Sequence, residues 1–350
     1  MVDEIHFLKF PRKLSSPCFI IAEAGVNHNG NIDLAHKLID AAIQARADAV
    51  KFQTFKAEKL ASKDAPSAQY QIDNMGPQLS QFEMLKRLEL PISAYPDLIS
   101  HCHQGGIVFM SSPFDEDSAD FLAGLGMPVF KIPSGEITNL PYLAHIASKQ
   151  KPMIVSTGMS NLGEVQTAVE TIEGAGNSDI VLLHCVSNYP ANPADVNLRA
   201  MHTLQAAFGV PVGFSDHTLG IEIPIAAAAL GACVIEKHFT LDCSMEGPDH
   251  KASLNPGGLA AMVAGIHKVE AALGTGRKIP TINEKSTAIA ARKSLIAACD
   301  IPAGTEFTQA MLAARRPGTG LPPSMHALIL GRKARRPIAS GAQIDLGMIE

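Results

Sequence analysis

Two histidines follow apolar segments of the chain and could together hold a metal ion. His217 lies in the run Phe214-Ser215-Asp216-His217-Thr218, and His238 ends the run Glu236-Lys237-His238. Imidazole is a normal ligand for Mn²⁺, Zn²⁺, Co²⁺ or Fe²⁺, and two protein ligands leave positions open for water and substrate oxygens. The alternative is a pair of hydrogen-bonded histidines at a polar rim. The two residues favour a catalytic metal site.

Two lysines and several serines indicate a site for an anion. Lys51 and Lys131 lie within apolar segments, and Ser134, Ser156 and Ser215 lie in or beside such segments. Ammonium groups together with hydroxyl donors suit a phosphate or a carboxylate. Two alternatives remain open, a Schiff-base lysine as in aldolases and a lysine that neutralises a buried carboxylate. The glycine-rich loops that bind nucleotides are missing from the sequence, which argues against a nucleotide site.

Two carboxylates accompany these groups. Glu23 and Glu136 could orient substrate hydroxyls or move a proton. Each could instead form a salt bridge with Lys51 or Lys131. The spacing along the chain does not separate these two interpretations.

The segments that contain these residues follow a repeating pattern along the chain. Short apolar runs, each ending in polar residues, alternate with stretches of helical periodicity, as 31–46, 161–175 and 256–273 show. Such alternation predicts a parallel sheet, and eight repeats predict a closed (β/α)8 barrel with its catalytic groups at the carboxyl ends of the strands. The runs are 20–23, 49–53, 107–111, 129–131, 153–157, 180–184, 212–217 and 234–238.

One connection is much longer than the others. The second crossover runs from Phe55 to Gly106, and its polar part is Ala61 to Ser80. A segment of this length is too long for an idle turn, so we expect it to arch over the mouth of the barrel. The alternative is an ordinary surface insertion.

The pattern changes after Leu273. A polar stretch precedes short β-like runs and turns that include Arg315-Arg316-Pro317-Gly318. We therefore expect a catalytic barrel at 1–280, a linker at 281–293 and a small β-rich domain at 294–350. A domain this small holds a modest core and would gain stability by docking on a partner surface.

Composition limits the classes of function. The net charge of −5 comes from interspersed acidic and basic residues, which does not suit nucleic-acid binding. No apolar run approaches the length of a membrane helix, and Met1 to Phe10 lacks the pattern of a signal peptide. The 6 cysteines are scattered, so we expect reduced thiols in a cytoplasmic protein.

The motifs resemble those of the sialic acid synthases over nearly the whole chain. The tail, with Arg315-Arg316-Pro317-Gly318, resembles the antifreeze-like (SAF) domain that follows the barrel in that family. The barrel motifs that carry the resemblance are Ile21-Ala22-Glu23-Ala24-Gly25-Val26-Asn27-His28-Asn29-Gly30, Val50-Lys51-Phe52-Gln53-Thr54, Ser111-Ser112-Pro113-Phe114, Lys131-Ile132-Pro133-Ser134-Gly135-Glu136, Ser156-Thr157-Gly158-Met159, Ser215-Asp216-His217-Thr218, Lys237-His238-Phe239-Thr240 and Gly247-Pro248-Asp249-His250.

The resemblance implies a reaction and a set of roles. Phosphoenolpyruvate would condense with N-acetylmannosamine or a close analogue to give a nine-carbon 2-keto acid and phosphate. His217 and His238 would hold a divalent metal, usually Mn²⁺ with Mg²⁺ or Co²⁺ possible, that polarises the sugar aldehyde. Glu136 would handle the attacking water, with Glu23 and Lys51 also catalytic. The positions that match phosphoenolpyruvate contacts are Lys51, Lys131, Ser134, Ser156, Ser187 and Ser215, and those that match sugar contacts are Glu23, Gln53, Tyr189 and Asp249.

The resemblance also implies a homodimer. In the family, the antifreeze-like domain of one subunit caps the barrel of the other, and an arginine reaches the N-acyl group of the sugar. Arg316 matches that position, and a fixed guanidinium suits a carbonyl oxygen. A surface arginine is the alternative.

One departure bears on the identity of the sugar. The chain reads Ser187-Asn188-Tyr189 where the N-acetylneuraminate synthases carry asparagine in place of Ser187, an order closer to the legionaminic acid synthases. N,N'-diacetyllegionaminate synthesis from 2,4-diacetamido-2,4,6-trideoxymannose is therefore the alternative activity. More remote alternatives are a Schiff-base aldolase or lyase, a synthase acting on a phosphorylated aldose, and an ice-binding tail.

Overall fold

The apolar runs form the strands of one parallel sheet in the computed structural model, which describes residues 17–75 and 80–350. The sheet order is β3-β2-β1-β8-β7-β6-β5-β4, and β3 packs beside β4, so that the sheet curls into a barrel. The expected (β/α)8 fold is confirmed. The strands are β1 (Phe19–Gly25), β2 (Ala49–Thr54), β3 (Val108–Pro113), β4 (Phe130–Ile132), β5 (Met153–Ser156), β6 (Ile180–Cys185), β7 (Val212–Asp216) and β8 (Val234–His238).

The strands are buried on both faces, which explains their continuous apolar sequences. Ile21, Met110 and Val234 belong to a cluster inside the barrel, whereas Ile20 and Ile235 belong to the larger core between the sheet and the helices. Successive residues therefore alternate between the interior and the helical layer, as the two-residue period of a strand requires.

Four helices of the layer around the sheet begin at capping residues. The side chains of Asn31, Asp115, Asn161 and Asn255 accept hydrogen bonds from backbone N–H groups in the first turns that follow them. No helix within the described ranges is long and apolar enough to cross a membrane. The helices of the layer are α1 (Ile32–Gln44), α5 (Tyr95–Gly105), α6 (Glu116–Gly124), α7 (Leu140–Ala147), α8 (Leu162–Gly174), α9 (Ala200–Phe208), α10 (Glu222–Ala229) and α11 (Pro256–Leu273).

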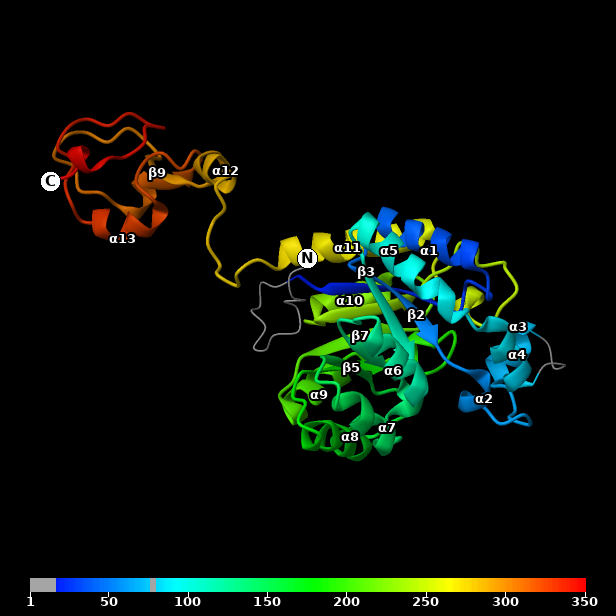
Figure 1. The fold of residues 1–350 in the computed structure, drawn as a ribbon. Helices are drawn as coiled ribbons and strands as arrows, with labels where there is room; N and C mark the ends of the chain where they lie inside the picture. Colours follow the sequence, from blue (N-terminus) through cyan, green and yellow to red (C-terminus); the bar gives the residue numbers. More distant parts are fainter. Residues whose placement is uncertain (1–16, 76–79) are drawn as a thin grey trace. The chain divides into compact units, whose positions relative to one another are not determined.

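The long second crossover contains three short helices. These are α2 (Ala57–Leu60), α3 (Gln69–Met75) and α4 (Gln81–Leu88), which lie together in Figure 1. Ser80 and Glu83 form a reciprocal capping box at the start of α4. Val26, Phe55, Met84 and Leu88 form a separate apolar cluster between this crossover and the end of β1. The crossover therefore has its own small core.

The remainder of the chain forms a second compact unit. The first unit ends at Gly274, and the second is Thr275–Glu350. It contains α12 (Glu284–Ala291), β9 (Ser294–Ala297), β10 (Leu312–Arg315) and α13 (His326–Ile329), with β9 and β10 antiparallel. Residues 281–293, expected as a linker, thus include the helix α12. The core of this unit comprises Leu295, Ala297, Ile301, Phe307, Leu312, Ile329, Ala334, Ile338, Ile344 and Ile349.

Candidate active site

The polar residues of the site continue the interior register of the strands. Ile21, Met110 and Val234 fill the inside of the barrel, and Glu23, Ser112 and Glu236 follow them two positions later. Residues two apart in a strand point to the same face, so these polar side chains also point into the barrel, nearer its carboxyl end. The same step gives Lys51 after Ala49, Lys131 after Val129 and Ser156 after Ile154.

These side chains line one cavity of about 320 Å³ at the mouth of the barrel. Both histidines, both lysines and most of the other predicted contacts belong to its wall. The predicted residues that line it are Glu23, Lys51, Gln53, Lys131, Ser134, Ser156, Ser187, Tyr189, Ser215, His217, His238 and Asp249.

Four buried charges occupy the floor of this cavity. Lys51 Nζ lies 2.7 Å from Glu23 Oε2 and 3.5 Å from Glu236 Oε2. Lys131 Nζ lies 3.4 Å from Glu236 Oε1. The two ammonium groups therefore alternate with two carboxylates, and each charge has an opposite neighbour in a place where water is largely excluded.

The two carboxylates differ in how readily they hold a proton. Burial raises the pKa of Glu23 to about 7, since Lys51 compensates only in part and Glu236 adds a like charge. Glu236 is equally buried, but Lys131, Lys51 and a hydrogen bond from Ser215 lower its pKa to about 2. Glu236 therefore stays ionised, whereas Glu23 can exchange a proton near neutral pH.

Hydroxyl groups complete the surroundings of the lysines. Lys51 Nζ donates to Ser112 Oγ at 2.9 Å, and Lys131 Nζ donates to Ser156 Oγ at 2.8 Å. Burial, with the nearby Lys51 charge, lowers the pKa of Lys131. Cations flanked by hydroxyls can bind a phosphate or a carboxylate that enters the cavity.

A third lysine in the same region has a structural role. Lys237 lies between Glu236 and His238 in β8, and the strand alternation turns its side chain away from the cavity. There its Nζ pairs with Asp216 and donates to the carbonyl of Thr218 at 2.6 Å. Lys237 thus neutralises a buried carboxylate outside the cavity. The same interpretation, considered for Lys51 and Lys131, fits their pairs with Glu23 and Glu236 inside the cavity.

A glycine makes room for a group of small polar side chains. A Cβ on Gly158 would lie 2.2 Å from Ser187 Oγ, 2.8 Å from Ser134 Oγ and 2.9 Å from Cys185 Sγ. The Gly158 N–H donates to Ser134 Oγ at 3.0 Å, so the Ser134 hydroxyl proton can be donated elsewhere. This corner supplies further donors for an anion, and a larger residue at Gly158 would displace the side chains that form it.

The two predicted metal ligands lie side by side. The ring centroids of His217 and His238 are 5.6 Å apart. Burial lowers the pKa of both imidazoles, and for His238 the neighbouring His217 and Lys51 charges add to the effect. Both rings are therefore neutral, as metal coordination requires.

The surroundings of the rings fit a bound cation. His217 Nδ1 lies 2.7 Å from the carbonyl of Val186, which fixes its proton there and leaves Nε2 as the free lone pair. His238 Nδ1 is a buried atom without a hydrogen-bond partner in the described structure and faces Asp249 Oδ2 at 3.9 Å. The described residues contain no group of three or more His, Cys, Asp or Glu that could hold a metal. Two protein ligands would thus leave most positions to water and substrates.

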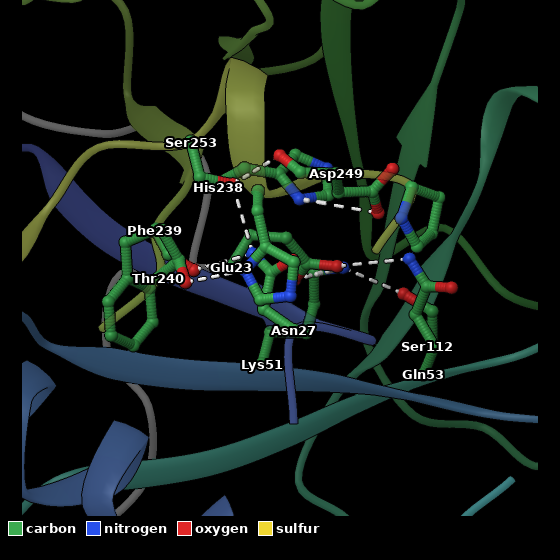
Figure 2. Close-up of polar contacts among 12 residues, drawn as sticks. Glu23, Asn27, Lys51, Gln53, Ser112, His238, Phe239, Thr240, Asp249 and Ser253 are labelled. Carbon is green, nitrogen blue, oxygen red and sulfur yellow. Dashed lines mark hydrogen bonds and ion pairs between the residues drawn. The ribbon is translucent and has the colours of Figure 1, made fainter. Parts of the chain in front are cut away.

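Loops above the strands position Asp249. The amide of Asn27 donates to the Phe239 carbonyl at 2.8 Å and to Ser253 Oγ at 2.9 Å, and that hydroxyl donates to the Asp249 carbonyl (Figure 2). Burial raises the pKa of Asp249 to about 6.

Gln53, on β2, contacts one of the carboxylates of the cavity floor. Its Nε2 donates a hydrogen bond to Glu23 Oε1 at 3.4 Å.

Two predicted residues lie apart from the cavity wall. Glu136 is half-buried, accepts a hydrogen bond from Asn139 at 2.8 Å and is not among the described lining residues. Arg316 follows β10 in the second unit and is exposed. The structure thus gathers the barrel residues and leaves these two outside the described wall.

Several lining residues carried no role in the sequence analysis. Glu236 belongs to the charged floor, and Ser112 accepts a hydrogen bond from Lys51 there. The two-residue period of a strand would have identified Glu236 from His238 and Ser112 from Met110. Tyr70 and Gln71 line the cavity from α3, so the long crossover reaches the mouth as expected. Their polar, irregular segment gave no periodic signal.

Comparison with known proteins agrees with the geometry. The profile of the NeuB family matches residues 38–278, and that of the SAF domain matches residues 292–350. The N,N'-diacetyllegionaminic acid synthase of Legionella pneumophila is 49% identical over 338 residues, 95% of each chain. The Campylobacter jejuni enzyme of the same name is 49% identical over 319 residues, 91% of this chain and 96% of its own.

A solved structure extends the similarity to the fold. The N-acetylneuraminic acid synthetase of Leptospira borgpetersenii superposes with a TM-score of 0.69 at 34% identity, over 78% of this chain and 90% of its own. The resemblance seen in the motifs is thereby confirmed. The chain belongs to the NeuB family and is an enzyme of the sialic or nonulosonic acid synthase type, with a C-terminal SAF domain.

Proposed function

We propose that this enzyme condenses phosphoenolpyruvate with 2,4-diacetamido-2,4,6-trideoxymannose to give N,N'-diacetyllegionaminate and phosphate. The observation that carries the reaction is the single cavity in which Lys51, Lys131 and the two histidines meet. The relatives that are 49% identical favour the legionaminic product over N-acetylneuraminate, the product that the sequence motifs alone predict.

The lysine end of the cavity would bind phosphoenolpyruvate. Its phosphate and carboxylate need several donors and at least two positive charges. Lys51 and Lys131 supply the charges, and the hydroxyls beside them supply the donors. The serines proposed for this role are Ser134, Ser156, Ser187 and Ser215.

The bonds change as follows. C3 of phosphoenolpyruvate bonds to the aldehyde carbon of the sugar, and the aldehyde oxygen takes a proton. Water adds at C2 and gives up one proton, which balances the proton taken by the aldehyde oxygen. The C2–O bond to phosphate then breaks, and the new C2 hydroxyl passes its remaining proton to the departing phosphate as it becomes the keto oxygen. A divalent cation held by His217 and His238 would act as a Lewis acid on the aldehyde. Mn²⁺ is our choice, and Mg²⁺ or Co²⁺ would also suit two imidazoles with open positions.

Two carboxyl groups are proposed to move protons. Glu23 faces the cavity with a pKa raised to about 7, which suits exchange with the sugar oxygen near neutral pH. Glu136 keeps the role that the family resemblance gives it, at the attacking water, although its side chain would first have to turn from Asn139. Gln53, Tyr189 and Asp249 would contact the sugar.

The apolar part of the cavity wall supports a deoxy sugar without a phosphate. Val26, Met84 and Leu88 line it from the apolar cluster of the crossover, together with Leu60, Leu85 and Phe114. Among the described lining residues, Lys51 and Lys131 are the only Lys or Arg, and both already face carboxylates. A methyl group at C6 suits this surface, whereas a sugar phosphate would lack a cation.

We also propose a homodimer in which Arg316 of one subunit reaches the acyl group of the sugar in the other. An exposed arginine of the second unit, Thr275–Glu350, which contains the SAF domain and is called the SAF unit below, is compatible with this role. The scattered cysteines favour the cytoplasm as the location.

The test is phosphate release from phosphoenolpyruvate by metal-stripped protein, with and without added Mn²⁺. We expect turnover that needs both metal and sugar, and a kcat/KM at least about tenfold higher for the trideoxy sugar than for N-acetylmannosamine. His238→Ala should lose activity, while His103→Ala, an exposed histidine on α5, should retain it.

Two results would contradict the proposal. If the enzyme releases no phosphate with either sugar, the condensation is excluded. Metal-independent cleavage of the keto acid, with a borohydride-trapped adduct on a lysine, would favour the aldolase alternative.

A further inference from the structure

We propose that Tyr70, on α3 of the long crossover, is a specificity residue whose hydroxyl donates a hydrogen bond to an acyl or hydroxyl oxygen of the acceptor sugar. This inference rests on the proposed function, because it assumes an acceptor sugar in the cavity. If it holds, the long crossover contributes directly to binding of the acceptor sugar.

Tyr70 belongs to an aromatic stack that crosses the cavity. Its ring stacks on Tyr189 with centroids 5.0 Å apart and planes 29° apart. Tyr189 in turn lies 4.1 Å from the ring of His217 and meets His238 edge-on at 5.7 Å. All four rings line the same cavity, so the α3 segment is in contact with the end of the site where the aldehyde is expected.

The segment is fastened to the opposite rim. Asn74 Nδ2 donates to the Pro248 carbonyl at 2.6 Å, next to Asp249. At the base of the segment, the Gln81 N–H donates to the Ala65 carbonyl at 3.3 Å. These bonds hold α3 across the mouth rather than away from it, which distinguishes it from a surface insertion.

The hydrogen bonds around Tyr70 determine which way its proton points. The Ala68 N–H, which can only donate, bonds to Gln71 Oε1 at 2.9 Å. The Gln71 amide is thereby oriented with Nε2 toward Tyr70 Oη, at 3.3 Å, and Nε2 can only donate. Tyr70 Oη is thus an acceptor in this contact, and its own proton has no acceptor among the described residues.

A donor without an acceptor in a half-buried wall is suited to a ligand oxygen. Burial raises the pKa of the Tyr70 phenol, and the Asp249 charge adds to the rise, so the group stays protonated. The acetamido carbonyls and hydroxyls of the acceptor are neutral acceptors of the right kind. Phosphoenolpyruvate is held by the lysines at the floor, and so the effect of Tyr70 falls on the sugar alone.

The test compares the KM of each substrate in Tyr70→Phe, Tyr70→Ala and the wild type. We expect the KM of the acceptor to rise about five- to tenfold in Tyr70→Phe and about thirtyfold or more in Tyr70→Ala. The KM of phosphoenolpyruvate should stay within about twofold, because its contacts are unchanged. Lys63→Ala, at an exposed position of the same crossover, is the matched control.

A second variant tests the direction of the hydrogen bond. In Gln71→Glu, a carboxylate would accept the Tyr70 proton and turn it away from the sugar. We expect Gln71→Glu to raise the KM of the acceptor as Tyr70→Phe does, and the double variant to show no further rise. Independent, multiplying effects of the two changes would overturn the role of the hydroxyl.

The outcomes separate this inference from the proposed function. If the wild type releases phosphate with the trideoxy sugar but Tyr70→Phe and Tyr70→Ala leave its KM unchanged, the inference is wrong and the function stands. If both KM values and the melting temperature change together, Tyr70 is structural and the inference is also overturned. If the wild type releases no phosphate with either sugar, the function fails and the inference with it.

Discussion

The barrel and the SAF unit place their charged residues in opposite ways. The barrel buries Glu23, Lys51, Lys131, Glu236 and His238 at its mouth, each less than one tenth exposed. Throughout 275–350, all of which the structure describes, Ser294 is the only buried polar or charged side chain. The arginines of this unit, at positions 277, 292, 315, 316, 332, 335 and 336, are all exposed.

This difference shows two ways of building function into a chain. Buried charges in the barrel must be mutually compensated, so each one depends on the others and their pKa values are shifted. The arginines of the SAF unit are exposed and remain available to another surface. Even Arg336, 3.6 Å from Asp345, and Arg332, which donates to the Leu328 carbonyl, are accessible to solvent. The barrel therefore carries chemistry, and the SAF unit can contribute only through what it presents.

The largest effect is expected from removing one buried charge. Lys51→Met leaves Glu23 and Glu236 facing each other without the intervening ammonium group. We expect a loss of roughly 3–5 kcal/mol of stability, because Glu23 loses its ion-pair partner while Glu236 keeps Lys131. We expect activity to fall about a thousandfold, because the contact proposed between Lys51 and phosphoenolpyruvate would be lost. Urea unfolding and phosphate release measure the two effects.

The same substitution in the other unit provides the control. Lys333 is exposed, and Lys333→Met should change stability by less than about 0.5 kcal/mol. Equal losses from the two substitutions would contradict the contrast between the two units.

A smaller effect follows from the raised pKa of Glu23. Since folding raises this pKa from 4.5 to about 7, the folded barrel binds the proton more tightly than the unfolded chain. The resulting stability is complete below pH 4.5 and is lost as the pH rises through 7, to a total of roughly 3 kcal/mol. Glu23→Gln should remove this part of the pH dependence.

The tyrosines make this prediction specific to the barrel. The chain has no tryptophan, and its 4 tyrosines all lie within residues 70–189 of the barrel unit. Tyrosine fluorescence of metal-stripped protein, followed through urea unfolding at several pH values, therefore reports on the barrel unit alone. The unfolding free energy of the wild type minus that of Glu23→Gln should fall as the pH rises from 4.5 through 7. A value of this difference that stays constant or rises with pH would contradict the assignment.

The barrel and much of its site could be predicted because strand periodicity is a local property. The apolar runs gave the strands, and the polar residues at their ends gave Lys51, Lys131, Ser156, His217 and His238. The same period distinguishes Lys237, which faces the helical layer, from Glu236, which faces the cavity. Applied strictly, the period would also have assigned Glu236 to the site.

Other parts of the site had no local signal. Tyr70 reaches the cavity through a turn-rich crossover held by bonds to residues about 170 positions away, such as Asn74 to Pro248. The pKa difference between Glu23 and Glu236 depends on four charges that come from four strands. The position of Glu136 outside the described wall depends on its bond to Asn139, which a sequence pattern does not show.

The smallest effect concerns the arginine that the SAF unit presents. If Arg316 binds the neutral acyl group of the sugar from the partner subunit, Arg316→Ala should raise the KM of the acceptor about tenfold without changing stability. Arg335→Ala, equally exposed, should have no such effect. The comparison of the two variants tests whether Arg316 contributes to acceptor binding while an equally exposed arginine does not.

Mixing two defective variants tests whether the arginine acts across subunits. In a hybrid of Arg316→Ala with His238→Ala, one site would combine an intact barrel with the intact arginine of the other subunit. Random reassociation of equal amounts makes half of the dimers hybrids, each with one complete site, so activity at low acceptor concentration should approach about a quarter of wild type. Arg316→Ala alone, at half the total protein, gives the baseline. If Arg316 serves its own barrel, no hybrid site is complete and the mixture stays at that baseline, because every intact barrel then lacks its arginine.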